Sequence, residues 1–186
     1  PVAAGLAGGS TDAAVTLIGL NQLWGLNLSI NELMSIGLKI GADVPFCLLG
    51  GTALAKGVGE KLTSLNPFKD HLILLANLGL EVSTAHVYNS LNIEGIKNRP
   101  DMGKILKAIG ENDLITLSTN MVNVLEEVTI GEYPQIGYIK DEMLKWGALG
   151  TLMSGSGPTV LGFFEREEDL NNCKYQLEGK VKKLIV

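Results

Sequence analysis

A glycine-rich stretch at the start of the chain, PVAAGLAGGSTDAA, has the composition of a loop that can hold an anion. Gly5, Gly8 and Gly9 let the backbone turn tightly and approach a ligand with no Cβ in the way. The helix predicted directly after them begins with N–H groups that have no partner inside the helix, at the positive end of its dipole. Such a loop is suited to bind phosphate, and an ordinary glycine turn before a helix is the alternative.

Two common phosphate-binding motifs do not match this sequence. The stretch GLAGGST has no lysine before its serine, as the P-loop requires. The stretch GVGEKL, residues 57–62, lacks the third glycine of the dinucleotide fingerprint. The opening loop would therefore have to hold phosphate mainly with its backbone amides.

Two further stretches could take part in the same chemistry. In MSGSGPT, Gly155, Ser156 and Gly157 lie between two apolar segments. They form either a plain hairpin turn or a second lobe of backbone packed against the first loop or a nucleotide. In IGADVPF, Asp43 follows a predicted helix and precedes Pro45. It is either a cap or turn former, or the group that orients or deprotonates an attacking hydroxyl.

The elements that must position these residues alternate between helices and strands of antiparallel type. This order favours an α+β fold over a parallel doubly wound sheet. The apolar spacing predicts helices over 10–24, 29–41, 102–110, 114–128, 134–147 and 165–179. Strands are expected at 71–78 and 180–186, a strand, glycine turn and strand over 148–164, and short strands and turns over 43–62.

Local signals predict how some of these elements begin and end. Ser10 or Thr11 is expected to cap the first helix, and Ser29 with Glu32 has the spacing of a capping box. Gly41 is expected to end the second helix. Pro67, just before the strand at 71–78, is expected to mark a domain boundary.

Composition limits the partners that the chain can have. With 46% hydrophobic residues a sizeable core is possible, and a net charge of −5 argues against a nucleic acid or an anionic membrane surface as a partner. A small anionic ligand stays possible. Cys47 and Cys173 match no metal-ligand spacing and are expected to be reduced thiols. No apolar run reaches the roughly 18–20 residues of a membrane span, and no signal peptide is recognised, so we expect a cytoplasmic protein.

Three of these stretches together resemble the GHMP kinase superfamily. Its signature loop is similar to the stretch that contains Pro1, Gly5, Leu6, Gly8, Gly9, Ser10, Ala13 and Ala14, and its later glycine motif is similar to Met153–Pro158. With IGADVPF added, the chain looks most like the branch that phosphorylates the 2-hydroxyl of 4-(cytidine 5'-diphospho)-2-C-methyl-D-erythritol in isoprenoid precursor synthesis by the non-mevalonate pathway. The similarity runs along nearly the whole chain.

The resemblance implies a GHMP kinase fold. Residues 1–66 would form the C-terminal part of an ATP-binding domain like domain 2 of ribosomal protein S5, and residues 67–186 a ferredoxin-like C-terminal domain. It also implies ATP and Mg²⁺ as cofactors, with no Mg²⁺ ligand assigned. By resemblance, Asp43 is the catalytic aspartate and Tyr88 stacks on the cytosine, although Tyr88 could equally be an ordinary helix aromatic. The ATP-binding loop would comprise Pro1, Val2, Ala3, Ala4, Gly5, Leu6, Ala7, Gly8, Gly9, Ser10 and Thr11, and the second glycine motif Gly155, Ser156 and Gly157.

The sequence also departs from the family. Members carry a further N-terminal segment with a lysine close to the catalytic aspartate, and no counterpart is recognised here. We therefore expect a fragment with an incomplete, weakly active or inactive site, with exposed apolar helix faces in its first half. The half from Pro67 onward should fold more independently. The alternatives are another GHMP small-molecule kinase, acting on mevalonate, homoserine or a sugar, and a non-catalytic fragment that serves in packing or association.

Overall fold

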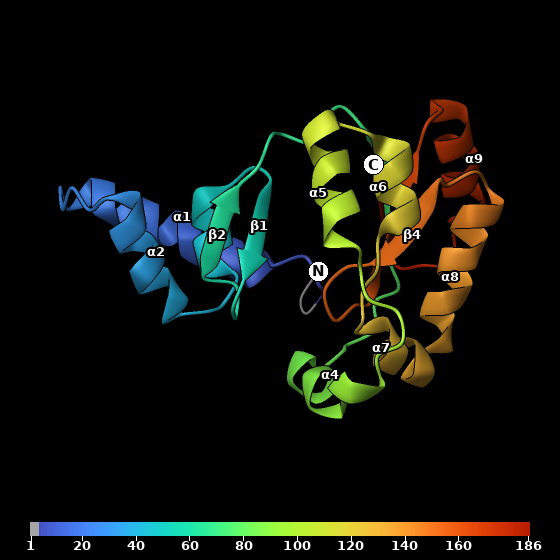
Figure 1. Cartoon of the computed structure of the whole chain (residues 1–186), viewed down its shortest axis with the longest axis horizontal. Coiled ribbons are helices and arrows are strands. Elements are labelled where there is room, and N and C mark those ends of the chain that lie inside the picture. The colour runs from blue at the N-terminus through green and yellow to red at the C-terminus, as the bar shows by residue number, and fades with distance from the viewer. Residues whose placement is uncertain (1–3) are drawn as a thin grey trace. The chain divides into compact units, whose positions relative to one another are not determined.

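The computed structural model describes residues 4–186, which divide into two compact units (Figure 1). One unit is Ala7–Phe68. The other consists of residues 4–6 together with Lys69–Val186. The chain therefore passes from one unit to the other within the opening glycine loop, and returns close to the expected boundary at Pro67.

The unit Ala7–Phe68 contains three helices followed by a hairpin. The helices are α1 (Gly8–Leu23), α2 (Ile30–Leu38) and α3 (Val44–Leu49), and strands β1 (Ala53–Lys56) and β2 (Lys61–Ser64) pair antiparallel. The helical conformation begins at Gly8, so the expected cap at Ser10 or Thr11 is wrong. Ala7 occupies the N-cap position at φ 49°, and the Thr11 hydroxyl donates back to the Ala7 carbonyl at 3.0 Å.

Three expectations for the next elements have different outcomes. The capping box is confirmed, because Ser29 Oγ accepts from the Glu32 N–H while the Glu32 carboxylate accepts from the Ser29 N–H. Helix α2 ends at Leu38, before Gly41. The start of the region expected to form strands is helix α3 instead, with Pro45 in its first turn, where the missing N–H costs nothing.

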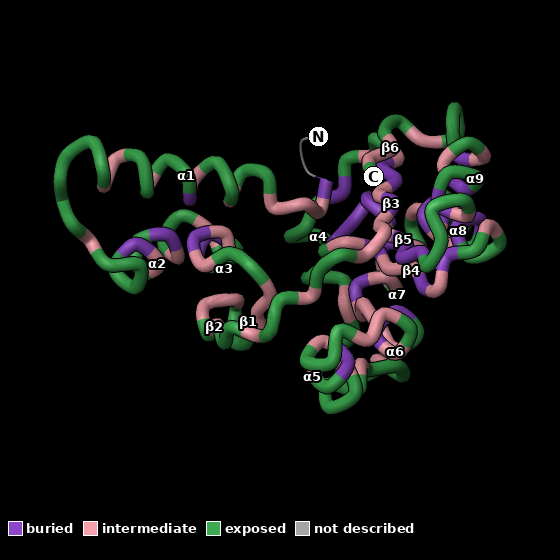
Figure 2. The backbone as a smooth tube through the Cα atoms, turned by 90° about the horizontal axis from the view of Figure 1, so that it is seen from above, coloured by how far each residue is buried: buried purple, intermediate pink, exposed green. Residues whose placement is uncertain are grey.

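The unit Ala7–Phe68 buries little apolar surface. Its core cluster consists of Ala14, Leu33, Val44 and Leu48. Several large apolar side chains on α1 and just after it are exposed, and Figure 2 shows most of α1 in the colour of exposed residues. These include Val15, Leu23 and Trp24, at 63%, 76% and 63% exposure. The expected exposure of apolar helix faces in the first half is confirmed.

The second unit is built on a four-stranded antiparallel sheet in the order β4-β5-β3-β6. Its strands are β3 (Leu72–Asn77), β4 (Gly150–Met153), β5 (Thr159–Phe164) and β6 (Lys183–Ile185). Its helices are α4 (Thr84–Ser90), a 3₁₀ turn at Ile93–Gly95, α5 (Met102–Glu111), α6 (Leu114–Asn120), α7 (Glu126–Glu132), α8 (Pro134–Lys145) and α9 (Glu167–Leu177). The antiparallel strands and the helices between them confirm the α+β class.

Helices α8 and α9 pack side by side against this sheet and close its core (Figure 1). Helix α8 contributes Ile136, Ile139 and Met143, at the spacing of one helix face, all at most 2% exposed. They meet buried residues of β3 and β5, including Leu74, Val160 and Phe164. Each such side chain contributes about 1.5–3 kcal/mol through burial.

The helix predicted over 114–128 is wrong in its middle. The segment Met121–Leu125 leaves the helical path and separates α6 from α7. Among the described residues, no helix has both the length and the apolar character needed to cross a membrane.

Candidate active site

Within the second unit, residues 4 and 5 of the opening glycine stretch contact the turn between β4 and β5 and the first residue of β5. The Ser154 hydroxyl donates to the Gly5 carbonyl at 2.6 Å, and the Thr159 hydroxyl donates to the Ala4 carbonyl at 2.6 Å. Thr159 is fully buried and accepts from the Asn77 side-chain amide at 2.8 Å. The first loop is therefore held by its carbonyls on the turn between β4 and β5, which is one of the two interpretations given above for this turn.

Gly5 is required at its position for two reasons. Its φ is 69°, in the left-handed region that favours glycine. A Cβ at this residue would stand 2.2 Å from the Ser154 carbonyl oxygen, which is a clash with backbone. Gly155 also lies close, since a Cβ there would be 3.6 Å from the Gly5 Cα. Of the other residues expected in this loop, Pro1, Val2 and Ala3 lie outside the described residues.

The first turn of α1 presents glycines to open space. Gly8 and Gly9 are exposed, and a Cβ on either would meet no atom within 4 Å apart from the neighbouring residues and the backbone of α1 itself. By helix geometry, the first N–H groups of α1 have no acceptor inside the helix. The end of α1 thus combines exposed backbone with a positive partial charge, as an anion-binding site requires.

Asp43 lies within the same unit, in a segment that contacts the start of α1. A Cβ on Gly41 would stand 3.9 Å from Ser10 Oγ, and Cys47 Sγ lies 3.6 Å from Thr11 Oγ1. Asp43 occupies the N-cap position of α3, yet its side chain makes no capping hydrogen bond, and the residue is exposed. The side chain of Asp43 therefore does not cap α3, although the residue lies in the turn before this helix, and its carboxylate is exposed.

Tyr88 lies on α4, whose first residue is linked to the second glycine stretch. The hydroxyls of Thr84 and Ser156 are 2.8 Å apart, and the buried Thr129 donates to the Ser156 carbonyl at 3.3 Å. Tyr88 is 61% exposed, one turn after Thr84 and on the same helix face. Its ring is thus free of the core and on the helix that contacts the turn between β4 and β5.

Sequence reasoning gave no role to the residues that support these loops. Ser154, Thr159, Thr84 and Asn123 contact the loops through pairings across 32 to 155 positions of the chain. The only local signal was the run of serine and threonine around the second glycine stretch, which is also typical of an ordinary turn.

The described residues contain no group of three or more His, Cys, Asp or Glu side chains placed to hold a metal ion. The described part of the chain also carries both cysteines as free thiols.

Family models match both parts of the chain. The model for the GHMP kinases N terminal domain matches residues 1–51, and the model for the GHMP kinases C terminal matches residues 105–183. The chain belongs to the GHMP kinase family. Within this GHMP kinase chain, the first match contains the glycine loop and Asp43, and the second contains the turn between β4 and β5.

Several known proteins are similar to this GHMP kinase chain. A 4-diphosphocytidyl-2-C-methyl-D-erythritol kinase from Alkaliphilus oremlandii is 54% identical over 169 residues, covering 90% of this chain and 58% of the relative. A crystal structure of 4-(cytidine 5'-diphospho)-2C-methyl-D-erythritol kinase matches the whole chain with a TM-score of 0.81 at 31% identity, covering 66% of that protein. A homoserine kinase from Cytophaga hutchinsonii matches at a TM-score of 0.79 and 21% identity, which shows the shared fold alone. The GHMP kinase chain thus spans less than two thirds of the length of these relatives.

Proposed function

We propose that the protein that carries this chain transfers a phosphoryl group from ATP to the 2-hydroxyl of 4-(cytidine 5'-diphospho)-2-C-methyl-D-erythritol. The observation that carries this proposal is the attachment of the Ala4 and Gly5 carbonyls to the Thr159 and Ser154 hydroxyls. In the unit Ala7–Phe68, the exposed glycines of the first α1 turn have open space at their Cβ positions and are available to a phosphate chain. Relatives that are 45–54% identical to the chain are named for this substrate.

The proposed roles follow from the chemistry of phosphoryl transfer, which requires alignment and charge stabilisation more than covalent help. The loop from Pro1 to Thr11 would wrap the ATP phosphates, with the backbone N–H groups at the start of α1 stabilising their growing negative charge. Asp43 would orient the attacking hydroxyl and accept its proton. The second glycine motif (Gly155, Ser156 and Gly157) would pack against the loop, and Tyr88 would stack on the cytosine.

Mg²⁺ fits this arrangement as a companion of ATP. The ion is usually bound through one or two carboxylates together with substrate phosphates and waters, so it does not need a cluster of three acidic residues. Bound Mg²⁺ would neutralise charge on the phosphates. The residues of this chain would hold the phosphates with their backbone amides. We assign no protein ligand to the ion.

The domain assignment and the setting belong to the same proposal. Residues 1–66 would be the C-terminal part of the ATP-binding domain and residues 67–186 the C-terminal domain of the kinase. The protein would work in the cytoplasm on a small-molecule substrate, without nucleic acid or membrane. Kinases of homoserine or mevalonate share the fold, but their matches lie at 13–21% identity and favour no other substrate.

The loop role is tested by Gly9→Ala, with Gly19→Ala as the matched control. Both glycines lie on α1 with open space around the Cβ position, so neither change strains the fold. Alanine in place of a helical glycine stabilises by up to about 1 kcal/mol. Only Gly9→Ala puts a methyl group where phosphate would approach. We expect calorimetric titration to show that Gly9→Ala loses Mg-ATP binding while Gly19→Ala keeps it. Equal binding by both variants would contradict the loop role.

The aspartate role is tested by Asp43→Asn in the whole protein that carries this chain, in an assay of ADP release with Mg-ATP and the cytidine-diphosphate methylerythritol substrate. A general base contributes about 10²–10⁴-fold, so turnover should fall by that factor while the melting temperature stays constant. Mevalonate and homoserine serve as substrate controls. Turnover of either at a rate equal to the proposed substrate would overturn the substrate assignment.

A further inference from the structure

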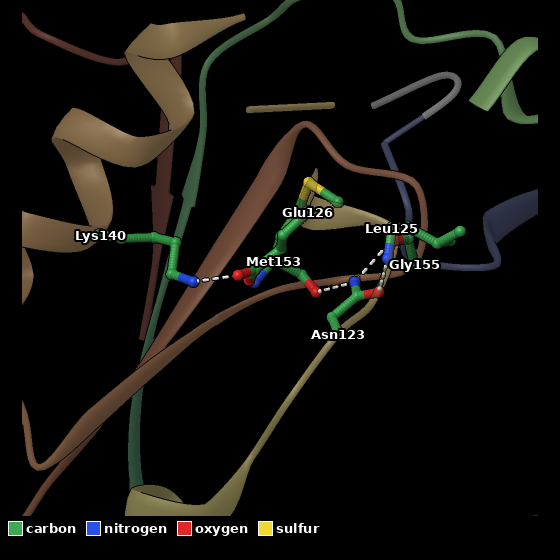
Figure 3. Close-up of polar contacts among 6 residues, drawn as sticks. All are labelled: Asn123, Leu125, Glu126, Lys140, Met153 and Gly155. Atoms are coloured by element: carbon green, nitrogen blue, oxygen red, sulfur yellow. Dashed lines mark hydrogen bonds and ion pairs between the residues drawn. The ribbon is translucent and has the colours of Figure 1, made fainter. Parts of the chain in front are cut away.

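The segment Met121–Leu125, which interrupts the helix predicted over 114–128, is held against the end of β4 by one side chain. The Asn123 side-chain amide donates to the Met153 carbonyl at 2.8 Å and to the Gly155 carbonyl at 2.7 Å (Figure 3). Its oxygen accepts from the Leu125 N–H at 3.0 Å. Asn123 therefore uses both of its donors on the turn between β4 and β5 and its acceptor on its own segment.

Glu126, at the start of α7, binds the backbone N–H of Met153, the residue whose carbonyl accepts from Asn123. One of its oxygens accepts from the Met153 N–H at 2.7 Å, and the other forms an ion pair with Lys140 of α8 (Figure 3). The Glu126 and Lys140 side chains are only 18% and 17% exposed. Both backbone groups of Met153 are thus bound by Asn123 and Glu126.

The position of Met153 in the sheet explains why such partners are needed. Among the strands of the described residues, β4 pairs only with β5, so it lies at the edge of the sheet. An edge strand turns half of its backbone groups away from the sheet, where they need other partners. Asn123 and Glu126 supply them at the last residue of β4, directly before the turn.

The turn fixed in this way is the one that holds the opening glycine loop. Ser154, the next residue, donates to the Gly5 carbonyl at 2.6 Å, and Gly155 lies beside Gly5. We propose that Asn123 and Glu126, with Lys140 orienting the glutamate, are positioning residues for the ATP phosphate loop. They fix the conformation of the turn at Ser154–Gly157, and the turn fixes the position of Gly5. The link to ATP rests on the function proposed above, whereas the link to the loop geometry does not.

A second interpretation treats this cluster as a ligand site. The same side chains border a surface hollow of about 250 Å³. However, the polar atoms of Asn123 and Glu126 are directed to backbone groups and to Lys140. The contacts therefore favour positioning over ligand binding.

The test compares Asn123→Asp with Asn120→Asp in the 186-residue chain. Aspartate at 123 keeps the size and the acceptor for Leu125, but places an anionic oxygen against two carbonyls. Asn120 donates its side-chain amide within α6, to the Thr116 carbonyl, so its aspartate variant loses a similar bond away from the turn. Two readouts are measured: amide hydrogen exchange by mass spectrometry, and the dissociation constant for Mg-ATP.

We expect Asn123→Asp to accelerate exchange in peptides covering 154–157 and 5–7 while β3 stays protected. Mg-ATP binding should weaken about tenfold, which corresponds to the loss of one or two hydrogen bonds. Asn120→Asp should leave both readouts unchanged. Should Asn123→Asp fail to fold, Glu126→Gln serves instead, because glutamine keeps an acceptor for Met153 but loses the charge that binds Lys140.

Other outcomes would overturn the inference. Unchanged exchange at 154–157 and 5–7, or faster exchange throughout the second unit, would reduce Asn123 to a general contribution to stability. Local acceleration with an unchanged Mg-ATP constant would separate the turn from nucleotide binding. If the unsubstituted chain binds no Mg-ATP, the proposed function fails for this chain, and the exchange data alone decide the geometric part.

Discussion

At the scale of single residues, the two cysteines occupy opposite environments. Cys173 has no exposed surface, and burial, with the nearby charge of Glu142 as a smaller cause, raises the pKa of its thiol to about 11. Cys47, on α3, is half-buried, and its thiol lies beside the Thr11 hydroxyl in the first turns of α1. Since the thiolate is the reactive form, Cys173 is protonated and inert at neutral pH.

This difference predicts selective alkylation. Iodoacetamide at pH 7.5 should modify Cys47 and leave Cys173 intact in the folded chain, as peptide mass spectrometry would show, and bound Mg-ATP should slow the reaction at Cys47. Cys47→Ser provides the control, because it should abolish labelling until the chain is unfolded. Labelling of Cys173 at a similar rate would contradict the burial described here.

Single residues also show how far the sequence could be used for prediction. The glycine loop and Asp43 were recognisable because their types and spacing are local. The bonds from Ser154 to Gly5 and from Thr159 to Ala4 were not, because a hydroxyl in a turn gives no sign of a partner some 150 positions away. Asp43 could have been a cap on sequence grounds, and only the structure shows that its side chain makes no capping bond.

At the scale of elements, an ionic contact joins α8 to the segment between α9 and β6. Glu142 is 9% exposed and accepts from Lys180 at 2.8 Å and from Lys145 at 3.3 Å. The hydrogen bond from Lys180 is the largest cause that lowers the pKa of Glu142, and the same bond raises the pKa of Lys180. Both shifts mean that folding favours the charged forms.

The stability from Glu142 should therefore depend on pH with a defined sign. It is fully present above the ordinary glutamate pKa of about 4.3, and is lost as the pH falls through the lower value of the folded state. Urea unfolding of wild type and Glu142→Gln should differ most near neutral pH and converge in acid. Glu111→Gln, in an exposed ion pair with Lys107, is the control and should show a small difference throughout. A constant difference for Glu142→Gln down to pH 2 would contradict the ionic origin.

Elements were predicted well where the pattern was long and failed where a side chain competed with it. Strands β3, β4, β5 and β6 and helices α5, α8 and α9 agree with the apolar spacing. The continuous helix over 114–128 does not form, because the Asn123 side chain binds the neighbouring Leu125 N–H and two distant carbonyls. Helix α3 lies in the stretch for which the sequence predicts short strands and turns, and a short apolar run of this kind has no clear period.

At the scale of the whole chain, the two units differ in the size of their buried apolar clusters. The unit Ala7–Phe68 has four residues in its buried cluster, whereas the cluster of the other unit has fifteen, spread over its sheet and helices. A part of a structure with few buried apolar contacts opens at a lower free energy than a part with many.

The difference predicts the order of hydrogen exchange. Amides of α1 and α2 should exchange before those of β3 and β5, in native-state exchange followed by mass spectrometry at several urea concentrations. The exposed apolar side chains of α1, among them Val15 and Leu23, would not protect it. Equal protection of α1 and β3 would show that the two units unfold together. The expectation that the half from Pro67 folds more independently stays a prediction until this is measured.

The attachment of residues 4 and 5 to residues 159 and 154 also has a consequence for the timing of biosynthesis. On the ribosome, Gly5 emerges 149 positions before Ser154. At about 5–20 residues per second, the delay is about 7–30 s. During that interval the loop has no docking partner, while α1 can already form from local contacts. The glycine loop is thus synthesised well before the turn that fixes it, and a ribosome that stalls before β4 releases a chain whose loop was never assembled.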